Sequence, residues 1–218
     1  MKYFVFSIDD GTVFDKMTIA LFNKYHVRAT FNLNSGLDDF VWYLNDLPIQ
    51  RLTLKDNVDL YANHEVASHT LTHPYLELCT DEEVIRQVKE DVDNLEKTFH
   101  REIVSFATPF HTSGEREVDL IRHNTKITNI RLSQFDKSFR LPKDPYHFRI
   151  TSLNIDDALS LVDEFIKDKD AELFVYAGHS YDFYVANSFD KLEALLKKIT
   201  QVEDITILPM GELTKKIF

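Results

Sequence analysis

The sequence contains little cysteine and little glycine, and both shortages limit what the chain can do. Its one cysteine, Cys79, excludes an internal disulfide framework and suits a reducing compartment. The 5 glycines form no GxGxxG or P-loop pattern, so the loops that usually cradle phosphate groups are missing. A GxSxG nucleophile elbow is missing as well. The nucleotide-binding and serine-hydrolase classes therefore lack their usual motifs in this chain.

Positive charge and long apolar runs are also scarce. The chain has 25 Lys and Arg against 36 Asp and Glu, and its net charge of -11 disfavours nucleic acid and anionic membranes as partners. No apolar run approaches the roughly 20 residues of a membrane-spanning helix. The opening MKYFVFSIDDG meets two aspartates too early for a signal peptide. We therefore expect a cytoplasmic protein without a membrane span; the sequence does not indicate its oligomeric state.

Apolar and aromatic residues, by contrast, are plentiful. With 218 residues, 44% of them apolar, the chain is long enough for one domain, residues 1–218, with a sizeable core. Short apolar runs rich in β-branched and aromatic residues alternate with helical patterns, which is typical of parallel strands joined by right-handed crossovers. This alternation predicts an α/β sheet or barrel. The expected strands lie in residues 3–8, 28–34, 65–68, 103–109, 127–133, 147–153, 173–179 and 205–210.

Three amphipathic helices are predicted, over residues 80–99, 154–167 and 188–199. Thr80 has capping-box spacing to a glutamate at the start of the first, and Asn154 is placed as the N-cap of the second. The inward face of the second helix is expected to consist of Leu159, Val162 and Ile166. That of the third is expected to consist of Leu192, Leu195, Leu196 and Ile199.

Polar and turn residues follow four of the predicted strands at the point where each strand ends. They are Asp9, Asp10, His69, Pro109, Phe110, His111 and His179. The carboxyl ends of parallel strands share one face of a barrel, where active sites form. Aspartates and histidines gathered on one rim have the composition of a metal site. We therefore expect these side chains to lie close together.

His69 and His73 give the strongest local signal for a metal. Their spacing of four would place two imidazoles on one helical turn, where each could give one nitrogen to a divalent ion. One aspartate of SIDDG would complete a His2Asp site, and the other would remain free as a general base. The alternatives are a capping or core histidine pair, and an ordinary Asx-type turn for the aspartates.

His179 is a candidate proton donor, because the ordinary pKa of imidazole is the nearest of any side chain to neutrality. Asp182 stands three residues further on and could orient the ring. The alternative is a histidine with a purely structural role.

Taken together, these stretches resemble the polysaccharide deacetylases of the NodB-homology type, carbohydrate esterase family 4 (CE4). The similar segments occur in the family's order: SIDDG at 7–11, RATFNLN at 28–34, HEVASHTLTH at 64–73, FATPFH at 106–111 and LFVYAGHS at 173–180. The resemblance implies a distorted, incomplete (β/α) barrel of seven strands. It also implies a metal-dependent hydrolase that removes acetyl groups from amino sugars.

Specific roles follow from the resemblance by position. Asp10, His69 and His73 would hold the ion, most often zinc, with cobalt or nickel as alternatives. Asp9 would be the general base and His179 the general acid. The backbone N–H of Phe110 would help to stabilise the oxyanion of the tetrahedral intermediate.

The chain also departs from the family pattern. Ala107 stands near the place of an arginine that pairs with the catalytic aspartate, and either Arg131 or Arg149 could approach from a neighbouring strand instead. His111 occupies a position where glycine is common, and would narrow or extend the pocket. The family's fourth motif has no counterpart. Trp42, the sole tryptophan, lies in an aromatic rim region at 34–60, where it would pack, line a groove or stack on a sugar.

The resemblance therefore implies an N-deacetylase acting on a carbohydrate or glycan precursor. An O-acetyl esterase or a non-sugar amide hydrolase with the same site is the near alternative. A non-catalytic sugar-binding relative is the third, motivated by Ala107. The lack of an export signal favours a soluble oligosaccharide, a lipid-linked or nucleotide-linked amino sugar, or a polysaccharide precursor as substrate.

Overall fold

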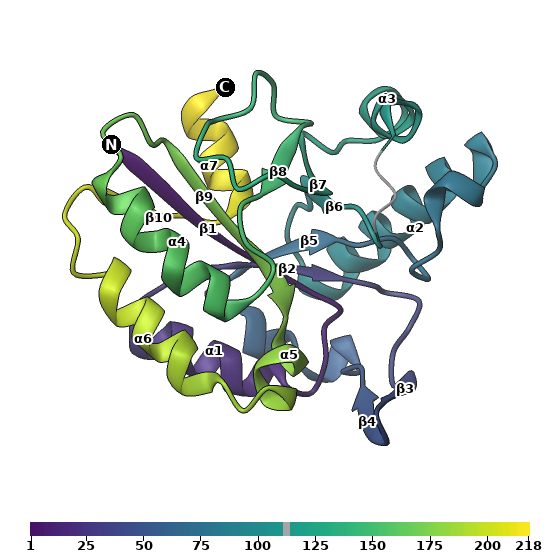
Figure 1. The fold of residues 1–218 in the computed structure, drawn as a ribbon. Helices are drawn as coiled ribbons and strands as arrows, with labels where there is room; N and C mark the ends of the chain where they lie inside the picture. Colours follow the sequence, from purple (N-terminus) through teal and green to yellow (C-terminus); the bar gives the residue numbers. More distant parts are fainter. Residues whose placement is uncertain (111–113) are drawn as a thin grey trace.

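The computed structural model describes residues 1–110 and 114–218. In this part of the chain, eight parallel strands form one sheet that curls into an incomplete barrel (Figure 1). The strands are β1 (Lys2–Asp9), β2 (Thr30–Leu33), β5 (Glu65–Ser68), β6 (Ser105–Ala107), β7 (Asn129–Phe135), β8 (Phe148–Ile150), β9 (Leu173–His179) and β10 (Ile205–Ile207).

Strand β1 is the centre of the sheet. It pairs with β9 along one edge and with β2 along the other, and β5, β6, β7 and β8 continue from β2. Strand β10 adds to the first residues of β1. The far end, β8, approaches β9 again through a single bridge between Ser152 and Tyr176. The seven strands other than β10 thus follow the course of the predicted incomplete barrel, and that fold prediction is confirmed.

Alternation along β1 decides which side chains reach the inside of the barrel. Phe4, Phe6 and Ile8 are fully buried in the main core between the strands and the helices. Val5 belongs to a second cluster, which includes Val175 of β9. Because successive side chains of a strand point to opposite faces, Asp9 shares the inner face with Val5. The end of β1 therefore delivers a carboxylate to the inside of the rim.

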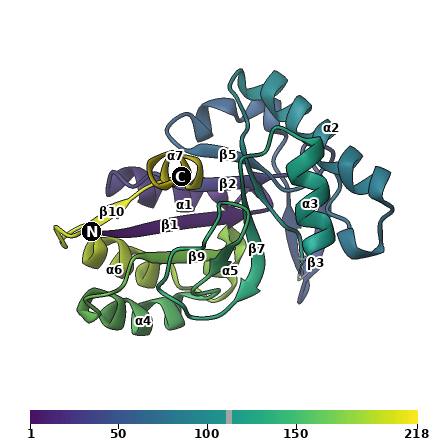
Figure 2. The same cartoon turned by 90° about the horizontal axis from the view of Figure 1, so that it is seen from above.

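Helices surround the sheet, with α1, α4 and α6 on one side of the molecule and α2 and α3 on another (Figures 1 and 2). Helix α7 differs, because Met210 and Leu213 pack on the inner cluster with Val5, and the Gly211 N–H donates to Glu65 of β5. The helices are α1 (Asp15–Lys24), α2 (Asp81–Phe99), α3 (Glu115–Asn124), α4 (Ile155–Lys167), α5 (Ser180–Val185), α6 (Phe189–Ile199) and α7 (Met210–Ile217). Short 3-10 turns cover Leu54–Asp56, Val58–Tyr61 and Leu76–Leu78.

The three predicted helices exist, and the caps predicted for two of them are observed. The Thr80 side chain accepts from the Glu83 N–H at the start of α2, and Asn154 accepts from the Asp157 N–H at the start of α4. The four leucine and isoleucine residues expected to face inward from α6 are all buried. The stripe predicted for α4 is partly wrong. Its buried face consists of Ile155, Ala158, Leu161, Val162 and Phe165, which leaves Leu159 and Ile166 half-buried at its margins.

The aromatic rim region contains an antiparallel hairpin, β3 (Val41–Leu44) and β4 (Leu47–Gln50), which extends away from the barrel (Figure 1). It is tied to the turn after β1, since the Val13 N–H donates to the Gln50 carbonyl at 2.9 Å and the Leu52 N–H donates to the Gly11 carbonyl at 2.8 Å. None of the helices in the described residues has the length and apolar character needed to cross a membrane. The assignment of residues 1–218 to one domain stays a prediction.

Candidate metal centre and active site

The turn after β1 brings two neighbouring aspartates to the same cavity. Asp10 has a φ of 84° and Gly11 a φ of 65°, so the chain turns sharply through two left-handed residues. A Cβ on Gly11 would lie 2.8 Å from Leu33 Cδ2, so this position needs glycine for space as well as for its φ. Both Asp9 and Asp10 line one cavity of about 590 Å³ at the rim of the barrel.

His69 and His73 do not lie on a helix, so that part of the prediction is wrong. They lie in a turn after β5, where Thr70 has a φ of 71° and His73 a φ of 54°. The His73 N–H donates to Thr70 Oγ1 at 3.0 Å, which closes the turn. Two left-handed residues thus bring the imidazole rings together by a different route from a helical turn, with their centroids 4.9 Å apart.

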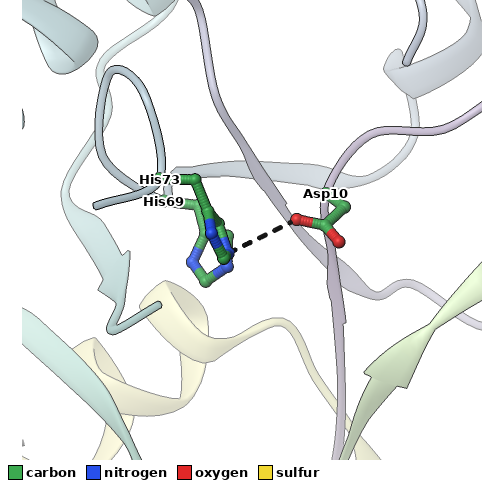
Figure 3. A group of neighbouring side chains, drawn as sticks. All are labelled: Asp10, His69 and His73. Carbon is green, nitrogen blue, oxygen red and sulfur yellow. Dashed lines mark ion pairs between the residues drawn. The ribbon is translucent and has the colours of Figure 1, made fainter. Parts of the chain in front are cut away.

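One ligand atom each from Asp10, His69 and His73 lies within 4.8 Å of the others (Figure 3). The ring of His69 is oriented by the Ala107 carbonyl, which lies 2.8 Å from Nδ1 and accepts its hydrogen, so Nε2 keeps a free lone pair. His73 Nε2 lies 3.6 Å from Asp10 Oδ1. Two imidazoles and one carboxylate suit a divalent ion and leave coordination positions open. The three residues expected to bind the metal are therefore brought together.

Burial and neighbouring charges together favour the metal-binding forms of these side chains. It lowers the pKa of His73 to about 3 and lowers the pKa of His69, so both imidazoles are neutral near pH 7. Burial alone would raise the pKa of Asp10, but His179 and the Arg51 guanidinium hold it below its ordinary value. The centre thus offers an ionised carboxylate and two neutral imidazoles, the forms in which these groups bind metal ions.

Asp9 has a different set of partners from Asp10. Arg131 Nη2 donates to both carboxylate oxygens, at 2.6 and 2.7 Å, and Asn32 Nδ2 donates to Oδ1 at 2.6 Å. Burial would raise the pKa of Asp9, but Arg131 and the nearby imidazoles outweigh it, so the pKa is below its ordinary value. Asp9 is therefore ionised, and its Oδ2 lies 4.0 Å from His69 Nε2.

Arg131 is the arginine that reaches this carboxylate. It stands on β7 directly beside Ala107 of β6 in the strand register, so the neighbouring strand supplies the guanidinium that position 107 lacks. The alternative, Arg149, is wrong for this purpose. Its side chain is exposed, pairs with Asp136 at 3.2 Å and lines a separate cavity of about 390 Å³.

His179 ends β9 and enters the same cavity. Its Nδ1 donates to Asp182 Oδ2 at 2.9 Å, so Asp182 holds the ring from one side, and its Nε2 lies 3.7 Å from Asp10 Oδ2. Burial would lower the pKa of His179, but the hydrogen bond that its ring donates to Asp182 and the charge of Asp10 raise it to about 9. The imidazole is therefore protonated near pH 7. The Tyr181 ring stacks on it at 4.6 Å between centroids.

Arg51 and Asn34 are among the polar residues of the centre that had not been identified from the sequence. Arg51, just after β4, donates from Nη2 to Asp10 Oδ1 at 2.8 Å and from Nη1 to the Asp10 carbonyl and to Asn34 Oδ1. Asn34 in turn donates to the carbonyls of His69 and Thr70. This network joins the hairpin, the turn after β1 and the histidine turn. A lone arginine after a short apolar run gives no motif that could have revealed it.

The remaining predicted residues lie at the edge of the cavity or beside it. Trp42 lines the cavity, with Arg51 5.3 Å from its ring centroid and the Tyr181 ring meeting it edge-on at 5.6 Å. Phe110 lines it too, with a φ of 53°, and Pro109 precedes Phe110 in the turn after β6. His111 lies outside the described residues.

Comparison with known proteins agrees with this architecture. A family model described as polysaccharide deacetylase matches residues 1–129. A family 4 acetyl xylan esterase from Clostridium thermocellum, in complex with a cobalt ion, has a TM-score of 0.65 and 13% identity, and the match covers 99% of this chain and 91% of that one. A mutant peptidoglycan deacetylase from Bacillus subtilis has a TM-score of 0.62 and 15% identity, and the match covers 99% of this chain and 92% of that one.

A CE4 family pseudoenzyme from Bacillus anthracis is similar as well, with a TM-score of 0.63 and 17% identity, covering 98% of this chain and 65% of that one. At such identities the three structures show a shared fold. No curated protein sequence matches the chain.

Proposed function

The chain belongs to the polysaccharide deacetylase family, and on that premise we propose that it is a metal-dependent hydrolase that removes acetyl groups from N-acetylated amino sugars. One observation carries the proposal. An ionised Asp9 and a protonated His179 lie in one cavity with the Asp10, His69 and His73 cluster. A base and an acid whose environments separate their pKa values, placed beside a metal centre, are what amide hydrolysis requires.

We propose that Asp10, His69 and His73 hold the ion and that it is zinc, with cobalt or nickel as alternatives. The nitrogen and oxygen donors suit zinc, and the acetyl xylan esterase of similar fold carries cobalt. When bound, the ion would act as a Lewis acid on the acetyl carbonyl and on water. Ala107 and Thr70 fix the ligands by holding the His69 ring and the turn before His73.

The proposed proton transfers use one side chain on each side of the reaction. Asp9 takes a proton from the attacking water, and Arg131 keeps its carboxylate ionised for that purpose. His179 gives a proton from Nε2 to the departing nitrogen, while Asp182 holds Nδ1. The C–N bond breaks, and acetate and a free amine are formed. The Phe110 N–H is proposed to donate to the oxyanion of the tetrahedral intermediate.

The same centre could serve an O-acetyl ester, as the similar acetyl xylan esterase illustrates. The protonated His179 favours the amide, because an amine leaves only after it gains a proton, whereas an alkoxide departs more readily. A non-catalytic role, as in the similar pseudoenzyme, is disfavoured because both proposed proton-transfer groups have their partners in place.

The test is acetate release from N-acetylated and O-acetylated sugars by metal-depleted protein, with and without added zinc, cobalt or nickel. Asp9→Asn should abolish release while leaving metal binding intact, because Asp9 is not in the ligand cluster. Asp136→Asn is the matched control, since Asp136 pairs with the exposed Arg149 away from the centre. The proposal would be contradicted if Asp9→Asn released acetate as fast as the wild type. It would also be contradicted if none of the added ions restored acetate release to the metal-depleted protein.

A further inference from the structure

The cavity has an apolar wall in addition to its charged centre. The apolar lining residues come from three separate segments: Leu37, Phe40 and Trp42 around the hairpin, Phe110 after β6, and Ile150 and Leu153 at β8 and beyond it. Phe40 is 51% exposed and Leu153 is 39% exposed. Single exposed apolar side chains are common on proteins, but residues of separate segments that converge on one cavity indicate a ligand surface.

Several of the polar lining groups already have hydrogen-bond partners within the protein. Arg51 is engaged by Asp10 and Asn34, and Thr72 meets the Gln87 side chain through both its N–H and its hydroxyl. Thr108 Oγ1 lies 2.9 Å from Ser133 Oγ. A long glycan would bring many hydroxyl groups, and each loses water on binding and needs a new partner. The described lining therefore suits a ligand with one polar end better than a run of sugar units.

The apolar wall begins at the proposed acid. Tyr181 stacks on His179, Trp42 meets Tyr181 edge-on at 5.6 Å, and Phe40 lies 6.3 Å from Trp42 with nearly parallel rings. Along β3, Val41 and Tyr43 are exposed and do not line the cavity, so alternation directs Trp42 toward it. The surface from Tyr181 to Phe40 is therefore continuous with the place where the leaving amine would sit.

We propose that the substrate is an acetylated amino sugar that carries a hydrocarbon group, as in a glycolipid, and that this group packs on Phe40, Trp42 and Leu153. This inference rests on the proposed function for the position of the acetylated sugar. A nucleotide-linked sugar is disfavoured, because its phosphate groups would need positively charged partners. The guanidinium groups that line the cavity, Arg51 and Arg131, are each already paired with an aspartate.

The sole tryptophan makes a direct test available, because Trp42 lies in the proposed wall and fluorescence changes report on it alone. The probes are the octyl and methyl β-glycosides of N-acetylglucosamine, triacetylchitotriose, and octyl β-glucoside, which lacks the acetamide. The octyl N-acetylglucosaminide should bind at least tenfold more tightly than the methyl one, the gain expected from burying about two methylene groups. It should also bind more tightly than the other two probes.

Two variants locate the hydrocarbon. Phe40→Ala and Leu153→Ala should each reduce the advantage of octyl over methyl by at least threefold, whereas Tyr43→Ala, on the same hairpin but outside the cavity, should keep it. The inference would be overturned if the octyl and methyl N-acetylglucosaminides bound equally tightly, or if the octyl compound gave no fluorescence response. It would also be overturned if triacetylchitotriose bound more tightly than the octyl N-acetylglucosaminide, or if octyl β-glucoside bound as tightly. The acetate assay tests the proposed function separately, since this advantage is measured by binding without turnover.

Discussion

Asp9 and Asp10 are neighbours in the chain, yet their carboxylates are held by different arginines. Arg131 on β7 donates hydrogen bonds to Asp9, and Arg51 at the end of the hairpin donates to Asp10. Arg131 and Arg51 are 3% and 5% exposed, so each pair is shielded from water and from salt. Two identical side chains at adjacent positions thus acquire separate environments, as the proposed roles of base for Asp9 and metal ligand for Asp10 require.

The first prediction concerns Arg131. Without its guanidinium, burial would dominate at Asp9 and raise the pKa of the carboxyl, so less of the base would be ionised near pH 7. Arg131→Met should lower kcat by about 100-fold and move the acidic limb of the pH profile to higher pH, with metal affinity retained. Arg149→Met, on the neighbouring strand, is the control and should behave like the wild type. An unmoved acidic limb would contradict the role of Arg131.

The second prediction concerns Asp182, which helps to raise the pKa of His179 to about 9. An acid must be protonated to act, so activity should fall as pH rises through the pKa of His179. Asp182→Asn removes one cause of the raised pKa, and the alkaline limb of the kcat/KM profile should therefore move to lower pH. Asp190→Asn, an exposed aspartate in α6, is the control. If the alkaline limb of the kcat/KM profile lay at the same pH in Asp182→Asn and the wild type, His179 could not be an acid whose pKa Asp182 raises.

At the scale of elements, the turn after β5 that contains His69 and His73 brings the two imidazole rings together, as a helical turn was expected to do. A β-branched residue with a positive φ is strained, and Thr70 has a φ of 71°. Its hydroxyl accepts from the His73 N–H, and Asn34 holds the Thr70 carbonyl at 2.7 Å. The turn is therefore maintained by side chains rather than by a helical backbone. Metal affinity should depend on those side chains.

The third prediction follows from this arrangement. Thr70→Ala removes the hydroxyl that accepts from His73, so His73 should be held less firmly and zinc affinity should fall by about tenfold. Thr70→Ser keeps the hydroxyl and should bind zinc as the wild type does. Competition with a chromophoric chelator measures both affinities without any substrate. Equal affinities in Thr70→Ala and Thr70→Ser would show that the hydroxyl does not organise the ligands.

At the scale of the molecule, the barrel could be predicted because buried parallel strands appear as continuous apolar runs that each end in polar residues. The hairpin could not be found that way, since β3 alternates between exposed and half-buried residues. Its turn residues, Asn45 and Asp46, both have positive φ, and this Asn-Asp pair was the signal available. Arg51 was missed with the hairpin, because its approach to Asp10 depends on where the hairpin docks.

The residues of the candidate centre that lie at strand ends or in recognisable motifs could be predicted from the sequence. Asp9 and His179 are the last residues of β1 and β9, and Asp10 follows β1, so the parallel topology brings the three side chains to one cavity. The helical interpretation of His69 and His73 failed because a spacing of four also arises in a turn with two left-handed residues, which periodicity cannot distinguish. The choice of Arg131 over Arg149 depended on strand register, which a single sequence does not specify.

The last prediction concerns the pH dependence of folding, through a carboxyl group buried beneath the histidine turn. Asp91 accepts from the Ser35 N–H at 2.7 Å and from Ser68 Oγ at 2.5 Å, and burial raises its pKa to about 7. Between pH 4 and 7 the folded state then holds a proton that the unfolded chain has lost, so this group lowers the stability of the protein as pH rises. The full effect is on the order of 4 kcal/mol.

Asp91→Asn cannot lose that proton, so the wild type should lose stability relative to Asp91→Asn between pH 4.5 and 7.5. Urea unfolding of both proteins across this range measures the difference directly. Asp93→Asn, exposed on the same helix, should give a curve parallel to that of the wild type. A difference between Asp91→Asn and the wild type that stays constant with pH would mean that the hydrogen bonds to Asp91 keep it ionised despite its burial. The carboxylate would then be a permanent acceptor for the loops around the metal centre.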